Sequence, residues 1–281
     1  MDMLTYSRGA WFVGNPPLIG PHAHSVWLGS AVFDGARAFD GCAPDLLPHC
    51  ERAVRSARII GLDPVLTGPE IAELAWDGIG RFPRGTHLYI CPCFYADGGF
   101  VIPDPETTQF ALTLSVSPLH EPKGFSAMVS SFRRPAPDQA PTGAKAACLY
   151  PNVARAYREA LQNGFDIGVS LDPDGAVAEF SFTNLFCAKG GTVFTPAPNG
   201  TFLNGLTRQR VIQLLRDDGF TVEETTLTPA EVKAADEVFA TGNYQKVAWC
   251  RKLDDVDFAE GPIYRRAREL YMAFARSEGC R

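Results

Sequence analysis

The stretch PTGAKAACLY (residues 141–150) places a single lysine, Lys145, among small residues, and Tyr150 follows it five positions later. A lysine in water is an ammonium ion and a poor nucleophile. When apolar surface encloses a lysine, its neutral amine becomes accessible and can form a Schiff base with a carbonyl group. A solvated surface lysine is the commoner situation, so this stretch alone leaves both interpretations open.

A carboxylate inside an apolar run is the second unusual feature. The run VAEFSFTNLF (residues 177–186) carries Glu179, with Asn184 five positions later. A buried carboxylate needs a cation or hydrogen-bond donors beside it. A protonated pyridine nitrogen is one such cation. Enzymes that use pyridoxal phosphate (PLP) need an acid at this nitrogen to keep the ring an electron sink.

Taken together, Lys145, Tyr150, Glu179 and Asn184 resemble the core of the class IV (fold type IV) PLP-dependent aminotransferases, above all the branched-chain amino acid aminotransferases. The resemblance covers residues 29–247 and implies a fold like that of D-amino acid aminotransferase, with an α+β small domain and a larger α/β domain. It implies that Lys145 holds PLP and moves the reacting proton. It also implies that Glu179 keeps the ring nitrogen protonated and that Tyr150 hydrogen-bonds the phenolic oxygen.

Two further stretches are candidates for binding the cofactor phosphate. In LNGLTR (residues 203–208), the amides of Leu206 and Thr207 and the threonine hydroxyl stand where a helix is predicted to begin, which suits an anion. A plain threonine N-cap is the alternative, but the stretch resembles the family's phosphate cup. Residues 49–57, HCERAVRSA, resemble the family's His-x-x-Arg-Leu-x-x-Ser-Ala helix. This resemblance assigns Arg52 to the phosphate, whereas an isolated Arg52 would be an ordinary solvated residue.

The loop TGNY (residues 241–244) matches the Thr-Gly-Thr-Ala loop of the branched-chain enzymes only in part. The resemblance implies that Asn243 donates to the phosphate in place of the family's second threonine. Tyr244 replaces an alanine whose amide faces the substrate carboxylate. Because tyrosine is much larger than alanine, we expect Tyr244 to reshape the substrate pocket.

The predicted substrate pocket departs from the family at two more positions. Cys91 stands where relatives that bind an α-carboxylate have arginine, and Leu28 stands where they have tyrosine. Tyr89 and Phe33 match the family pattern. An unpaired carboxylate in an apolar pocket costs several kcal/mol, so the losses favour a donor without a carboxylate. The remaining residues of interest are arginines that could substitute for the lost one: Arg37, Arg133 and Arg134.

The chain is therefore interpreted as a PLP-dependent transaminase that moves an amino group between a donor and a 2-oxo acid, with (R)-amine activity expected from the altered pocket. A branched-chain or D-amino acid aminotransferase is the first alternative. A PLP lyase of the aminodeoxychorismate type and a non-catalytic protein with a phosphate cup are the others. A homodimer is expected, because sites of this family resemble clefts that are completed by a loop from the neighbouring small domain, and such a cleft must exclude water.

The composition is that of an ordinary globular protein, with 46% hydrophobic and 21% charged residues. A net charge of −6 with no basic run argues against nucleic acid as a partner. The first residues are not a secretory signal, and no apolar run approaches the roughly 20 residues of a membrane span. A cytoplasmic protein with its eight cysteines reduced is expected. No metal site is expected, because residues 91–93 (CPC) lack the CxxC spacing.

The alternation of predicted elements is typical of two α/β or α+β domains. We expect a small N-terminal domain (residues 1–114), a linker with two prolines (115–123) and a large PLP-binding domain (124–281). Strands are predicted at residues 9–13, 31–39, 87–90, 110–114, 127–131, 167–171 and 221–226, and helices at 46–60, 69–80, 152–163, 208–218 and 263–275.

Overall fold

The computed structural model describes residues 1–278 and 280, and the chain divides into two compact units. The first unit consists of Met1–Leu119, Gly143–Leu149 and Phe274–Arg281, and the second of His120–Thr142 and Tyr150–Ala273. The first long segment thus ends inside the predicted linker. The units differ from the predicted domains because the segment with Lys145 and the end of the chain belong to the first unit.

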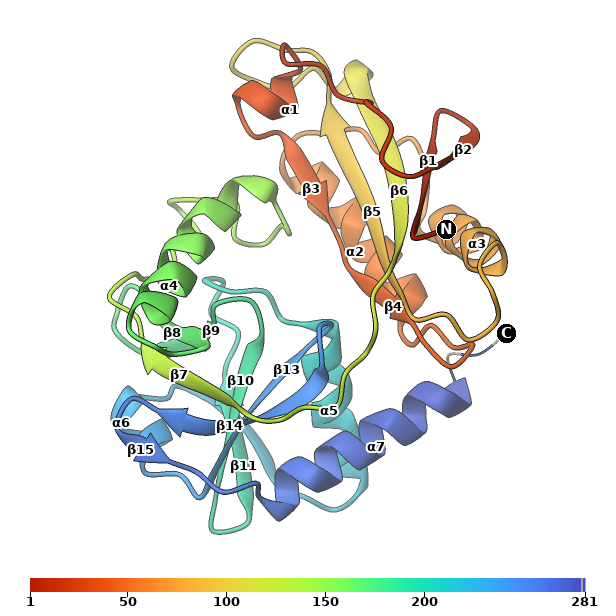
Figure 1. The fold of residues 1–281 in the computed structure, drawn as a ribbon. Helices are drawn as coiled ribbons and strands as arrows, with labels where there is room; N and C mark the ends of the chain where they lie inside the picture. Colours follow the sequence, from red (N-terminus) through yellow and green to blue (C-terminus); the bar gives the residue numbers. More distant parts are fainter. Residues whose placement is uncertain (279, 281) are drawn as a thin grey trace. The chain divides into compact units, whose positions relative to one another are not determined.

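The first unit is built on an antiparallel six-stranded sheet in the order β2-β1-β6-β5-β3, with β4 also paired to β5 (Figure 1). Helices α2 and α3 contact each other and strand β5. The strands are β1 (Met3–Ser7), β2 (Ala10–Val13), β3 (Ala31–Phe33), β4 (Ala36–Ala38), β5 (Leu88–Ala96) and β6 (Thr108–Val116). The helices are α1 (His24–Trp27), α2 (Leu46–Ile59), α3 (Gly68–Gly80) and the 3-10 turns η1 (Pro105–Thr107) and η2 (Ala147–Leu149).

The predicted helices at residues 46–60 and 69–80 are confirmed as α2 and α3. The strand predicted over residues 31–39 is instead two short strands with a break at Asp34 and Gly35. The Tyr89 hydroxyl occupies the space that a Cβ on Gly35 would need, 2.2 Å from its ideal position. Glycine therefore permits the close approach of β5 at this break.

The second unit has a mixed sheet in the order β12-β11-β10-β13-β14-β7-β8-β9, with β15 paired to β14. The pairs β11/β12, β14/β7 and β7/β8 are parallel, and the others are antiparallel. The strands are β7 (Phe125–Val129), β8 (Ile167–Leu171), β9 (Val177–Phe180), β10 (Asn184–Lys189), β11 (Thr192–Pro196), β12 (Val222–Thr225), β13 (Glu237–Gly242), β14 (Lys246–Leu253) and β15 (Val256–Asp257). The helices are α4 (Tyr150–Gln162), α5 (Leu206–Asp217), α6 (Pro229–Lys233) and α7 (Pro262–Glu278). The part of α7 from Phe274 onward belongs to the first unit. No helix of the described residues is long and apolar enough to cross a membrane.

The two faces of this sheet have different roles. On one face, Leu185 and Ala240 belong to an apolar cluster with side chains of β7, β8 and β9, and β9 contacts β10. On the other face, Asn184 lies opposite Thr241 on the neighbouring strand. Helix α5 contacts β13, and its first turn carries the predicted phosphate-binding residues. The candidate residues on this face are Asn184, at the start of β10, and Thr241, near the end of β13, and the stacked rings of Phe186 and Phe239 lie on the same face.

The expectation that every cysteine is reduced is wrong for two of the eight. An isolated antiparallel bridge sets Cys42 beside Cys280, and the two form a disulfide across 238 residues of sequence. The sequence did not predict this pair because only the bridge brings the two positions together. The free cysteines of the described residues are Cys50, Cys91, Cys93, Cys148, Cys187 and Cys250.

Candidate active site

The first unit holds Lys145 through its backbone as well as its side chain. The Lys145 amide donates to Ser56 Oγ on α2 at 3.0 Å, and its carbonyl accepts from the Phe33 amide at 3.1 Å. Its ammonium nitrogen lies 5.1 Å from the centroid of the Phe33 ring, a favourable cation–π distance. Lys145 is half-buried and lies against an aromatic ring. The structure thus favours the enclosed lysine over the solvated one.

Arg52 is held by a carboxylate that sequence analysis missed. Arg52 donates to Asp34 through Nε at 2.6 Å and through Nη2 at 2.9 Å. His49 Nδ1 lies 2.6 Å from the same carboxylate, whose side chain is completely buried. Burial alone would raise the pKa of Asp34, but the charges and hydrogen bonds of Arg52 and His49 hold it well below its usual range. Arg52 is therefore a fixed residue and not a solvated one.

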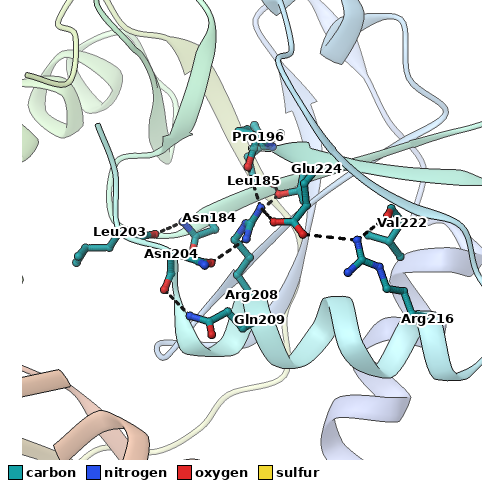
Figure 2. Close-up of polar contacts among 11 residues, drawn as sticks. Asn184, Leu185, Pro196, Leu203, Asn204, Arg208, Gln209, Arg216, Val222 and Glu224 are labelled. Carbon is teal, nitrogen blue, oxygen red and sulfur yellow. Dashed lines mark hydrogen bonds and ion pairs between the residues drawn. The ribbon is translucent and has the colours of Figure 1, made fainter. Parts of the chain in front are cut away.

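In the second unit, Glu179 is buried among polar partners. Arg134 Nε lies 3.5 Å from Glu179 Oε1, and Asn184 Nδ2 donates to Oε2 at 3.3 Å. The same Asn184 amide donates to the Leu203 carbonyl at 3.0 Å (Figure 2). A cation and an amide donor suit an ionised carboxylate. Glu179 is buried, and it has the partners that a buried carboxylate needs.

Helix α5 begins without a side-chain cap. Its N-cap is Gly205, and the described residues form no side-chain cap there. Helices α3 and α6 differ, since each has a complete capping box. Thr207 is buried at the second helical position, so the alternative of a threonine N-cap is wrong. The amides of the first turn have no intrahelical acceptor, so they are available to an anion, as at other helix N-termini.

Arg208 fixes the turn that leads into α5 (Figure 2). Its guanidinium donates to Asn204 Oδ1 at 2.8 Å, to the Pro196 carbonyl at 2.8 Å and to Glu224 Oε2 at 2.9 Å. Burial lowers the pKa of Arg208 below its usual value, and the hydrogen bond and charge of Glu224 offset only part of this effect. One fully buried guanidinium thereby links the turn to β11 and β12. The role of Arg208 is not visible in the sequence, because its partners lie in distant segments.

The loop between β13 and β14 supplies the other candidates of this unit. Thr241 is completely buried, and no described residue forms a hydrogen bond with its hydroxyl. Asn243 accepts a hydrogen bond from Lys246 Nζ at 2.6 Å through its side-chain oxygen. The side chain of Tyr244 is 60% exposed. Tyr150 opens α4 in this unit.

The predicted pocket residues of the first unit lie on β3, on β5 and at the end of α1. Phe33 contacts Lys145 as described, and Tyr89 packs against Gly35. Burial raises the pKa of the Cys91 thiol to about 12, although the charge of Lys145 lowers it in part. Cys91 is therefore neutral at pH 7 and cannot replace a cation. Leu28 follows α1 and is exposed.

The three arginines considered as substitutes all have other partners. Arg37 donates to the carbonyl and hydroxyl of Ser117. Arg133 donates to the carbonyl of Pro173. Arg134 donates to the Thr201 carbonyl as well as lying beside Glu179. The structure thus gives no support to the idea that one of them replaces the family arginine.

Comparison with known proteins decides the family. The family model described as amino-transferase class IV matches residues 31–253. The chain belongs to the class IV aminotransferases. The crystal structure of a PLP-bound aminotransferase from Brucella abortus is 47% identical, with a TM-score of 0.97 over 99% of this chain and 100% of that one. The branched-chain aminotransferase of Escherichia coli is 30% identical over 91% of this chain and 87% of its own. The branched-chain aminotransferase of Thermoproteus uzoniensis, solved with norvaline, is 29% identical, with a TM-score of 0.91 over 99% of this chain and 96% of that one.

These relatives confirm the fold type IV architecture, the PLP cofactor and the transaminase activity. The donor groups of this chain fit PLP. A half-buried lysine can hold its aldehyde carbon, a buried carboxylate can pair with its ring nitrogen, and the uncapped first turn of α5 with the buried Thr241 hydroxyl can bind its phosphate. Among the described residues, no group of His, Cys, Asp or Glu side chains could hold a metal ion.

Replacing Asp34 should show that its carboxylate holds Arg52. In Asp34→Asn the buried ion pair is broken, so we expect a loss of roughly 3 kcal/mol in the free energy of unfolding at pH 7, measured by urea unfolding. Because folding lowers the pKa of Asp34, its stabilisation is complete above the unfolded pKa of about 3.9 and declines as the pH falls below that value. The difference between wild type and variant should therefore shrink in acid.

The matched control is Asp77→Asn, which removes an exposed carboxylate paired with Arg81. This change should cost less than about 1 kcal/mol. An Asp34→Asn cost as small as that of the control, or one that does not change between pH 7 and pH 3, would contradict the role given to Asp34.

Proposed function

We propose that this transaminase takes a branched-chain or similar apolar L-amino acid as amino donor and a 2-oxo acid as acceptor. The observation that carries the proposal is the similarity to branched-chain aminotransferases, which extends over nine-tenths of the chain. The structure solved with norvaline, an apolar amino acid, adds support. In this chain Phe33 provides an apolar ring beside Lys145, which suits an aliphatic side chain.

Each reacting group has a residue assigned to it in this proposal. Bound PLP supplies an electron sink that stabilises negative charge at the substrate carbon. Lys145 holds the cofactor and, once released, carries the proton from the substrate carbon to C4′ of the cofactor. Glu179 keeps the ring nitrogen protonated, with its carboxylate held by Arg134 and Asn184. Tyr150 donates to the phenolic oxygen.

The phosphate is assigned to donors of four residues, and the buried Thr241 hydroxyl is a further candidate. The first-turn amides of α5, at Leu206 and Thr207, lack a side-chain cap and suit an anion. Asn243 contributes its amide. Arg52 contributes its charge from the pair with Asp34, which limits the rotamers that the guanidinium can adopt.

An (R)-amine donor is the second candidate, and the substituted pocket favours it. Cys91 and Leu28 replace the arginine and tyrosine that help to hold a substrate carboxylate in relatives. Cys91 is a neutral thiol, and the arginines that could compensate donate to Ser117, Pro173 and Thr201. A donor with an apolar group in place of the carboxylate would leave no charge unpaired in such a pocket.

A homodimer is part of the proposal because the first unit exposes an apolar patch, which consists of residues 26–28 and 100–102. Phe100 is 89% exposed, and the other five side chains are at least half exposed. The His24 amide donates to the Asp97 carbonyl at 3.0 Å, so the start of α1 lies beside the β5–β6 connection (Figure 1). Large contiguous apolar patches mark interaction sites, and a second copy of the chain would cover this one.

Glu179→Gln tests the assignment of the ring-nitrogen acid. A neutral amide cannot hold the pyridinium proton, so we expect the transamination rate to fall by more than about tenfold, roughly 1.4 kcal/mol of barrier, while PLP stays bound. The measurement combines initial rates with the visible absorbance of the cofactor. Glu223→Gln, a change at an exposed position of β12, is the control. A loss below tenfold for Glu179→Gln would make this residue structural.

Initial rates with two donors separate the two candidate functions. L-Leucine and (R)-1-phenylethylamine are compared, each with 2-oxoglutarate and with pyruvate as acceptor. The branched-chain proposal predicts that L-leucine is faster by about a hundredfold or more, roughly 2.7 kcal/mol. Equal rates, or a faster (R)-amine, would replace it with the second candidate.

Charging the apolar patch should weaken the dimer. A carboxylate cannot be buried in an apolar interface without a partner, so we expect Val101→Glu to sediment as a monomer at concentrations at which the wild type is dimeric. Val65→Glu changes another exposed valine outside the patch and should remain dimeric. A fully active monomeric wild type would refute the proposal of a dimer.

A further inference from the structure

Lys246 is a buried cation to which the proposed chemistry gives no task. It is the first residue of β14 and pairs with Gly242 across the hairpin. Its side chain is only 1% exposed, and its φ of +65° lies in the left-handed region that residues other than glycine seldom adopt. Burying an ammonium group costs free energy unless polar groups compensate for the lost water. A residue kept under both constraints calls for a specific partner.

The partners of Lys246 restrict what its neighbour can do. Its Nζ donates to Asn243 Oδ1 at 2.6 Å and lies 5.7 Å from the centroid of the Tyr271 ring. An ammonium group has three donors and no acceptor. Lys246 can therefore bind only the oxygen of the Asn243 amide. As a result, the NH2 group of that amide, which is a donor, is turned away from Lys246.

The surroundings of this amide suit an anion. Two residues earlier, Thr241 is completely buried, and its hydroxyl has no hydrogen-bond partner among the described residues. Thr241 lies opposite Asn184 in the sheet. A Cβ on Gly205 would lie only 2.1 Å from Asn184 Oδ1, so this end of β10 directly adjoins the N-cap of α5. The donors of the β13–β14 loop and of the α5 first turn thus belong to one region of the second unit.

We propose that Lys246 is a positioning residue of the phosphate site: by binding Asn243 Oδ1, it orients the Asn243 amide so that the NH2 group faces the cofactor phosphate. A threonine hydroxyl, which the family has at the position of Asn243, rotates to donate without help. An asparagine amide can present either its oxygen or its NH2 group, so it needs a neighbour that selects one of them. The inference rests on the proposed role of Asn243 in phosphate binding.

The test compares the affinities of the apoprotein for PLP and for pyridoxal, which lacks the phosphate. Lys246→Met keeps the length of the side chain but has no donor. We expect the Kd of PLP to rise about tenfold and that of pyridoxal to change less than about twofold. Lys246→Gln keeps a donor for Asn243 and should retain most of the preference for PLP. Lys252→Met, at another lysine of β14, is the matched control and should change neither Kd.

Asn243→Asp separates this inference from the function on which it rests. An aspartate keeps the contact with Lys246 but offers no donor to the phosphate, so it should weaken PLP and leave pyridoxal unchanged. If neither Asn243→Asp nor Lys246→Met affects PLP binding, Asn243 is not a phosphate ligand, and both assignments fail. If Asn243→Asp weakens PLP binding and Lys246→Met does not, the orienting role of Lys246 is wrong.

Two further outcomes would also overturn the inference. In one, Lys246→Met weakens PLP and pyridoxal equally, as expected of a residue that only supports the fold. In the other, Lys246→Gln loses as much as Lys246→Met. Should Lys246→Met fail to fold, Lys246→Leu, which also lacks a donor, takes its place.

Discussion

The buried carboxylate of Asp34 is the interaction on which the candidate site residues of the first unit depend. It receives hydrogen bonds from Arg52 and lies within hydrogen-bond distance of His49, both of which belong to helix α2. Ser56, on the next turn of the same helix, accepts a hydrogen bond from the Lys145 amide. These residues recur at the three- to four-residue spacing that places them on one side of a helix. The ion pair thus anchors Arg52, the residue assigned to the phosphate, on the helix whose Ser56 binds the backbone of Lys145.

In the second unit, hydrogen bonds position the amides of the α5 first turn, and the helix dipole favours an anion beside them. The first turn of α5 has no side-chain cap, and its amides are held in place because Arg208 links the preceding turn to two strands. In the protein without a ligand, these amides have no side-chain acceptor, and unsatisfied donors cost free energy. A phosphate bound there would satisfy them, so cofactor binding should stabilise this unit. Rigid donors that need no rearrangement are what an anion site requires.

The sequence predicts the reacting groups better than the residues that position them. Glu179 stands out because a carboxylate in an apolar run needs partners if it is buried, and the residue is buried. Asp34 meets the same condition but lies at the break in a predicted strand, where the turn has to be known before its partners can be found. Arg208 and Lys246 were not predicted. The partners of Arg208 lie in distant segments, and the polar loop around Lys246 is typical of a solvated lysine.

The secondary structure was also predicted only in part from the sequence. Helices α2 and α3 follow from their periodicity and terminal signals, whereas strands β10 and β13 were missed. Each of these strands has a neighbour on both sides and is buried at almost every position, so it lacks the alternation that identifies a strand with one solvated face. The disulfide between Cys42 and Cys280 was missed because a contact across 238 residues leaves no local signal.

The central claim, that Lys145 carries the cofactor, can be tested by reduction of the PLP-loaded enzyme with borohydride, followed by peptide mapping. Reduction converts the linkage between PLP and an amine into a stable bond, so the modified lysine retains the added mass. Lys246 is a second buried lysine of the same chain and serves as an internal comparison. The account predicts the added mass on the peptide that contains Lys145 and none on the peptide that contains Lys246. Added mass on the Lys246 peptide would contradict the account. So would loss of the cofactor's yellow colour on reduction with no added mass on either peptide.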